Sequence, residues 1–152
     1  MKIKLMLVAV LGIATLFTVQ PVQAQTKPNQ IAPSVSFGGS TAVFGVDSRF
    51  PVAPNISIRP TIRFPSGGIV LGTSATYDFD MYGSNVGLEP YAGAGFNVYT
   101  GDNSNNGANV TGYVIGGADY SLNDQFALKG SVAIPFKSEY STDITFGVGY
   151  KF

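Results

Sequence analysis

The sequence predicts an all-β fold: an eight-stranded antiparallel up-and-down transmembrane β-barrel that follows a cleaved signal peptide. Polar and apolar residues alternate with a period of two along most of the chain beyond residue 30, as is typical of strands with one apolar face. Seven clusters of turn-forming residues separate eight such segments. Charged residues make up only 12% of the chain, whereas soluble domains usually contain about 25%. A water-facing surface normally carries more charge than this, so the composition favours a membrane environment.

The first 24 residues have the pattern of a secretory signal peptide. Lys2 and Lys4 precede an apolar run, and small residues stand at the −3 and −1 positions of a cleavage site, Val22-Gln23-Ala24. The alternative is a retained anchor, but the apolar run over 5–19 is shorter than the roughly 20 residues that a spanning helix needs. We therefore assign residues 1–24 to a signal peptide, 25–30 to a short polar leader and 31–152 to the barrel.

Turn residues set the strand boundaries within the barrel. Glycine, proline and asparagine gather at sites such as Pro65-Ser66-Gly67-Gly68 and Ala53-Pro54-Asn55. Prolines at 60, 90 and 135 fall inside predicted strands and count against uninterrupted ladders, since proline has no NH to donate. The predicted strands are 31–37, 41–50, 56–64, 69–81, 88–99, 109–121, 125–136 and 142–152.

The charged residues of these strands all lie on the face opposite the apolar one. In the last strand, Ile144, Phe146 and Val148 share one face while Asp143 and Lys151 lie on the other. An Arg or Lys on a lipid-facing wall at mid-bilayer costs roughly 2–4 kcal/mol, so this partition is what a membrane barrel requires. The charges on the polar face are Asp47, Arg49, Arg59, Arg63, Asp78, Asp80, Glu89, Asp119, Lys129, Asp143 and Lys151.

Alternation alone does not say which face lies inside, because a soluble lipocalin-like barrel has the reverse arrangement. Glycines such as Gly45, Gly93 and Gly117 share the charged face, and small residues suit a narrow interior beside long arginines. The short turns at 53–55, 83–85 and 122–124 all fall at the end that holds the C-terminus, as expected for periplasmic turns. Aromatics of the apolar face gather near strand ends, as in an aromatic girdle: Phe50, Phe64, Tyr77, Phe79, Tyr120, Phe126, Phe136, Tyr150 and Phe152.

The C-terminal segment Thr-Asp-Ile-Thr-Phe-Gly-Val-Gly-Tyr-Lys-Phe, residues 142–152, resembles that of small eight-stranded outer-membrane barrels of the OmpA and opacity types. The resemblance covers about residues 31–152. This chain departs from the family in two ways: it has no Trp, and its outer loops are compact. It implies a bacterial outer-membrane location and contact with outer-membrane lipid. It also implies that Phe152, with Tyr150 and Val148, forms a signal read by the barrel-assembly machinery.

The residue inventory argues against catalysis. The chain has no His and no Cys, which removes the usual general base, the thiolate nucleophile and the commonest metal ligands. Asp78 and Asp80 could be read as a carboxylate pair, but we expect ion pairing instead. The loop 102–107 starts like a calcium loop, yet Tyr113 stands where the twelfth-position acid belongs. We expect no catalytic residue, no metal and no cofactor; a formal net charge of zero also gives no surface for nucleic acid.

The charges instead predict a polar plug. Most fall in the half of the barrel near the termini, with Arg63 and Asp143 near the outer rim, and Asp47 is expected opposite Arg59. An eight-stranded barrel is just wide enough for its side chains, so a satisfied network should fill it. The predicted function is a non-enzymatic outer-membrane barrel with a structural or surface-interaction role. The alternatives are a narrow porin-like channel and a soluble periplasmic lipocalin-like ligand carrier. The predicted lumen network is Asp47, Arg49, Arg59, Asp78, Asp80, Glu89, Asp119, Lys129 and Lys151.

Overall fold

The computed structural model describes residues 27–81, 87–101 and 109–152. The expected signal peptide, the first two residues of the expected leader, the turn at 83–85 and the calcium-like loop 102–107 lie outside the described residues. Within the described part of the chain, no helix is long and apolar enough to cross a membrane. The strands are β1 (Gln30–Gly38), β2 (Thr41–Ala53), β3 (Ile56–Phe64), β4 (Gly68–Asp78), β5 (Leu88–Gly101), β6 (Asn109–Ser121), β7 (Phe126–Pro135) and β8 (Asp143–Lys151).

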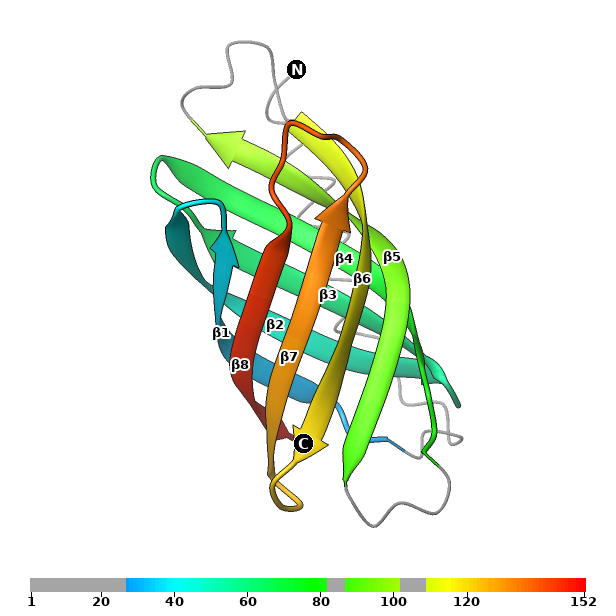
Figure 1. Ribbon diagram of the computed structural model, residues 1–152. Coiled ribbons are helices and arrows are strands. Elements are labelled where there is room, and N and C mark those ends of the chain that lie inside the picture. The colour runs from blue at the N-terminus through cyan, green and yellow to red at the C-terminus, as the bar shows by residue number, and fades with distance from the viewer. Residues whose placement is uncertain (1–26, 82–86, 102–108) are drawn as a thin grey trace, which may run out of the picture.

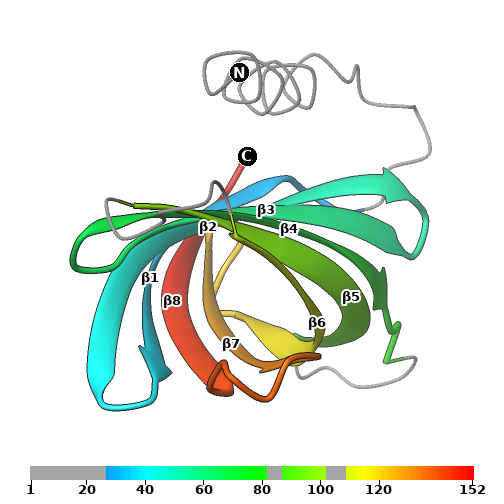
Figure 2. The same ribbon diagram turned by 90° about the horizontal axis from the view of Figure 1, so that it is seen from above.

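The eight strands form one closed antiparallel barrel in chain order. Each strand pairs with the next, and β1 pairs with β8 to close the ring, as the view from above shows (Figure 2). The strands run obliquely, with the C-terminus at one end and the β7–β8 connection at the other (Figure 1). The predicted all-β, eight-stranded up-and-down barrel is therefore confirmed.

Strand boundaries differ from the predicted ones by one to three residues at most ends. The largest differences are in β2, which continues to Ala53, and β4, which ends at Asp78 rather than at residue 81. The β2–β3 register shifts between Pro51 and Ala53, a bulge that lengthens β2 at its end. The prolines do not break the barrel: the β3–β4 register runs without a shift through Pro60, which lies opposite Thr73.

The interior of the barrel is polar and its outer wall is apolar. Arg59 and Asp78 are each 1% exposed, whereas Phe44 and Phe146 on the outer wall are 67% and 57% exposed. Apart from Pro51, the buried apolar side chains among the described residues are three alanines and two tyrosines, Tyr91 and Tyr113. The charged face of the alternating pattern is thus the lumen face.

Glycine on the lumen face makes room for large side chains. Gly117 lies directly opposite Tyr91 in the β5–β6 ladder. A Cβ atom at residue 117 would lie 2.7 Å from the Tyr91 ring and 2.4 Å from the Gly130 carbonyl oxygen. The neighbouring Gly116 faces outward, where an added Cβ would meet one atom, 3.9 Å away. Gly117 therefore permits Tyr91 to lie across the lumen.

Candidate functional site in the barrel lumen

Arg59 is the centre of the lumen site. It projects from β3, with its Nη2 atom 3.1 Å from Asp78 on β4 and its Nη1 atom 3.0 Å from Asp119 on β6. Its Nε atom donates to the Thr76 hydroxyl at 3.0 Å, and its guanidinium carbon lies 3.5 Å from the centre of the Tyr91 ring. Because β3 and β6 are not neighbours in the ring, the Arg59–Asp119 contact crosses the lumen.

Arg49 adds a second cation beside Asp119. Its Nη1 atom lies 2.6 Å from Glu89 on β5 and 3.2 Å from Asp119. Two arginines therefore share Asp119, and the chain of contacts runs from Glu89 through Arg49, Asp119 and Arg59 to Asp78. Asp78 also accepts a hydrogen bond from the Ser57 hydroxyl. Charge-assisted hydrogen bonds of this kind are roughly twice as strong as neutral ones.

Lys129 and Asp47 form the next layer. The Lys129 Nζ atom, from β7, lies 4.0 Å from the Asp47 carboxylate on β2, and both side chains are about 95% buried. The predicted cross-strand pair of Asp47 with Arg59 is wrong, because Asp47 lies opposite Thr61. Counting inward from the predicted strand ends at residues 50 and 56 places Asp47 opposite Arg59. The β2 strand instead continues to Ala53, which pairs with Ile56, so Asp47 lies opposite a residue farther along β3. Arg59 instead reaches the carboxylates of β4 and β6.

A third layer lies towards the end of the barrel opposite the termini. The Arg63 Nη1 atom is 3.7 Å from Asp143 on β8, and Arg63 Nη2 donates to the Thr145 hydroxyl at 3.1 Å. Thr145 shares a 2.9 Å hydrogen bond with Ser36 on β1. Polar contacts thus join strands that are not neighbours at three successive depths. Arg59 and Arg63 make the contacts of the first and third layers, and the Lys129–Asp47 pair of the second layer lies level with Thr61.

Asp80 lies outside the lumen network that the sequence predicts for it. It follows the end of β4, is exposed, and forms an ion pair of 2.9 Å with Lys27 of the leader. The hydrogen bond from Lys27 lowers the pKa of the Asp80 carboxyl. The reason for the wrong assignment is the strand end: alternation no longer fixes side-chain direction beyond Asp78. Without Asp80, basic and acidic residues of the barrel strands are equal in number: Arg49, Arg59, Arg63, Lys129 and Lys151 against Asp47, Asp78, Glu89, Asp119 and Asp143.

Lys151 lies at the terminal end of the barrel. Its Nζ atom donates to the Ser121 hydroxyl at 2.9 Å and to the Asn123 carbonyl at 2.8 Å. It therefore ties β8 to the β6–β7 turn, and its contacts are with neutral oxygens.

The partners that sequence reasoning missed are neutral residues. Tyr91, Thr76 and Ser57 complete the surroundings of Arg59 and Asp78, and all three are at most 2% exposed. Their position in the alternating pattern could have revealed them, because Tyr91 is two residues from Glu89 and Thr76 is two from Asp78. A census of charges alone overlooks such residues.

The three residues of the expected assembly signal face outward. Val148, Tyr150 and Phe152 are 49%, 44% and 60% exposed. The Phe152 backbone exchanges two hydrogen bonds with Asn29, of 3.1 and 3.0 Å. The end of the chain thus contributes to closing the barrel next to the start of β1.

The lumen chemistry consists of ion pairing. The buried carboxylates are contacted by arginines, hydroxyls and a lysine. Among the described residues, no group of three or more acidic side chains could hold a metal ion.

Comparison with known proteins shows the fold. No protein-family model and no curated protein matches the sequence. The barrel is similar to a designed transmembrane β-barrel at 20% identity and a TM-score of 0.67, covering 86% of this chain and 100% of the designed one. It is similar to the N-terminal barrel domain of Pseudomonas aeruginosa OprF at 20% identity and a TM-score of 0.63, covering 83% and 98%. Neisserial surface protein A matches at 18% identity and a TM-score of 0.54, covering 82% and 94%.

These neighbours include both a natural surface protein and a designed barrel, so the shared architecture carries no single activity. Taken with the closed ring and the polar lumen, they show that this chain has the fold of the small eight-stranded outer-membrane β-barrels.

Proposed function

We propose that the chain is a non-enzymatic protein of the bacterial outer membrane, with a structural or surface-interaction role and a lumen closed by ion pairs. The observation that carries this proposal is the partition of side chains between lumen and wall. Large apolar residues such as Phe44, Val132 and Phe146 are exposed around the barrel, whereas soluble monomers rarely expose contiguous apolar patches larger than a few hundred Å². Lipid is the environment that suits such a wall.

The same partition argues against the soluble lipocalin-like alternative. A carrier of apolar ligands needs an apolar lumen, and the lumen here is lined by buried Arg59, Asp78, Asp119 and Lys129. Outer-membrane lipid is accordingly the first proposed partner. The barrel-assembly machinery is the second, acting on the outward-facing C-terminal residues during insertion.

The plug is favoured over a narrow porin-like channel by the contacts that cross the lumen. Arg59 reaches from β3 to β6, and Lys129 reaches from β7 to β2, at different depths. The side chains involved are at most 6% exposed, so water has almost no access to them. Ion flow would require these pairs to separate in a low-dielectric interior, which is costly.

The test is conductance of the purified protein in planar bilayers, with fractionation to place it in the membrane. Wild-type protein should sediment with membranes, require detergent for release, and conduct little or nothing. A folded Arg59→Ser/Asp119→Ser variant should conduct more than wild type, and Arg63→Ser/Asp143→Ser at the rim is the matched control. Steady, ion-selective conductance from wild type would overturn the plug and favour the channel.

A further inference from the structure

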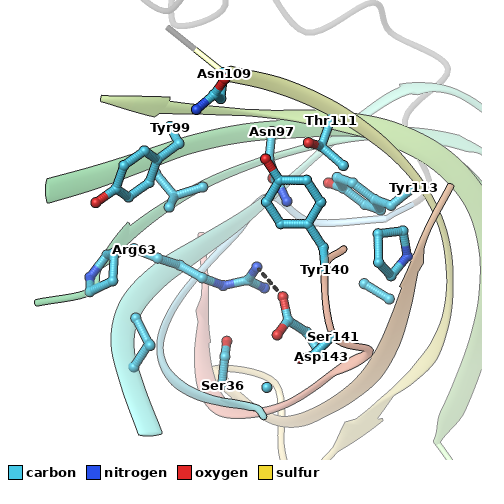
Figure 3. Close-up of a pocket in the computed structure, with 16 residues that line it drawn as sticks. Ser36, Arg63, Asn97, Tyr99, Asn109, Thr111, Tyr113, Tyr140, Ser141 and Asp143 are labelled. Carbon is cyan, nitrogen blue, oxygen red and sulfur yellow. Dashed lines mark ion pairs between the residues drawn. The ribbon is translucent and has the colours of Figure 1, made fainter. Parts of the chain in front are cut away.

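The outer mouth of the barrel contains a cavity that the plug leaves open. It has a volume of about 440 Å³, within the usual size range of small-molecule sites. Figure 3 shows Tyr140 over its centre, Tyr113 and Asn97 on its β5–β6 wall, and the Arg63–Asp143 pair opposite. We refer to this cavity, lined by these five residues among others, as the outer cup.

We propose that the outer cup binds an uncharged saccharide of one or two units. This inference rests on the surface-interaction role proposed above and names its ligand class. Two features of the cup, its charge and its mixture of rings with amide and hydroxyl groups, point to that class.

The charges of the cup favour a neutral ligand. Among the described residues that line the cup, Arg63 and Asp143 are the charged ones, and they form an ion pair of 3.7 Å, so their net charge is zero. An anionic or cationic ligand would gain from one partner and be repelled by the other. A pair of vicinal hydroxyls suits both, because each hydroxyl can accept from the guanidinium and donate to the carboxylate.

The remaining lining has the amphipathic character of a sugar. Tyr113 and Tyr140 offer ring faces for the apolar CH face of a pyranose, while Asn97, Asn109 and Thr111 offer amide and hydroxyl groups. Tyr113 is 5% exposed and rigidly held in β6, whereas Tyr140 is 41% exposed. The Tyr140 NH donates to the Lys137 carbonyl at 3.2 Å, which turns the β7–β8 connection over the cup. The Tyr113 ring is thus held in place by β6, and the Tyr140 ring lies at the entrance of the cup.

The cup also has a fixed floor. Arg63 is 8% exposed and donates to Thr145, which is itself hydrogen-bonded to Ser36. The guanidinium is therefore positioned before a ligand arrives, which reduces the ordering cost of binding. Such a small open site should bind weakly, with a dissociation constant on the order of 1 mM.

The sugar could be free in the medium or could be the terminal unit of a surface glycan. We would follow the tyrosine and Asn97 side-chain NMR signals of the full-length folded barrel in phosphatidylcholine nanodiscs, avoiding detergents with sugar headgroups. The titrants are methyl glucoside, methyl galactoside, methyl mannoside, lactose and, as the charged comparison, glucuronate. A second arm uses nanodiscs that contain lipopolysaccharide.

At least one neutral sugar should give saturable shifts confined to the cup, and glucuronate should bind at least fivefold more weakly. Shifts only with lipopolysaccharide would assign the ligand to an attached glycan. Tyr140→Ala and Asn97→Ala should each weaken binding at least tenfold. The matched control is Tyr120→Ala, because Tyr120 is also 41% exposed but lies on the outer wall at the opposite end. Folding of every variant is checked by heat-modifiable migration.

Absence of saturable shifts in both arms would overturn the proposal, as would equal binding by Tyr140→Ala and wild type or tighter binding of glucuronate. Membrane fractionation and conductance test the proposed outer-membrane location and the plug without any sugar, so failure of sugar binding is distinguishable from failure of the proposed function.

Discussion

Replacing Arg59 by alanine tests the lumen network at its most connected residue. The change removes three donors and a cation: the contacts to Asp78, Asp119 and Thr76, and the stacking on Tyr91. Asp119 keeps Arg49 at 3.2 Å, but Asp78 is left with hydroxyl partners only. Stranding one buried charge in this way costs about 3–5 kcal/mol.

The assay is equilibrium unfolding by urea in lipid vesicles, followed by far-ultraviolet circular dichroism and by heat-modifiable migration. Arg59→Ala should lower the free energy of unfolding by about 3 kcal/mol or more. Adding Asp78→Asn should recover part of the loss, because the stranded charge is removed while the Ser57 contact can persist. Arg63→Ala is the matched control and should cost less than half as much, since water reaches the one-third exposed Asp143.

A loss below about 0.5 kcal/mol for Arg59→Ala would refute the reasoning, because surface substitutions typically fall in that range. The same conclusion would follow if Asp78→Asn destabilised the Arg59→Ala protein further.

Four other outcomes are expected. Gly117→Ala should destabilise the barrel by about 1–3 kcal/mol through collision with Tyr91, whereas Gly116→Ala on the outer wall should be nearly neutral in the same unfolding assay; equal effects would contradict this account of the lumen. Deleting Phe152 should lower the yield of folded barrel in cells; if the side chain is the assembly signal, Phe152→Ala should lower it too, whereas normal yield from Phe152→Ala would assign the effect to the lost Asn29 hydrogen bonds. Because Lys27 lowers the pKa of Asp80, their ion pair should be fully formed above the ordinary carboxyl pKa range and be lost as the pH falls through the lowered pKa of Asp80. In the Lys27→Ala protein, carboxyl NMR titration should show a higher pKa for Asp80. No turnover is expected with lipid A, phospholipid or peptide substrates, and turnover abolished by Asp78→Asn or Glu89→Gln would contradict the non-enzymatic assignment.

Alternation carried most of the fold prediction because it is repeated in every strand. The last strand is the clearest case: Ile144 and Phe146 face outward while Thr145 is buried. Because one face of each strand is buried and the other is exposed, the direction of every side chain within the strand is fixed, whichever residues it pairs with. Ten of the eleven charges predicted to point inward lie within strands, and only Asp80 lies beyond a strand end.

Pair identities could not be predicted in the same way. Whether Asp47 lies opposite Arg59 depends on where the β2–β3 turn begins. The β2 strand continues to Ala53, beyond its predicted end at residue 50, and alternation does not report where a strand ends. Arg59–Asp119 joins strands that are not neighbours, so it depends on barrel closure and side-chain reach rather than on a turn. The outer cup likewise combines residues from all eight strands, the β3–β4 turn and the β7–β8 connection, and it exists only once the barrel has closed.

The central claim is that the apolar wall faces lipid around a closed polar lumen, and spin-label accessibility tests it most directly. The chain has no Cys, so single replacements can be labelled without background. Labels at Val132→Cys, Ile144→Cys and Val148→Cys, in vesicles, should be accessible to molecular oxygen and shielded from a water-soluble nickel complex. A label at Ser66→Cys in the exposed β3–β4 turn should show the reverse. High nickel accessibility at all three wall positions in a folded, vesicle-bound protein would contradict the account.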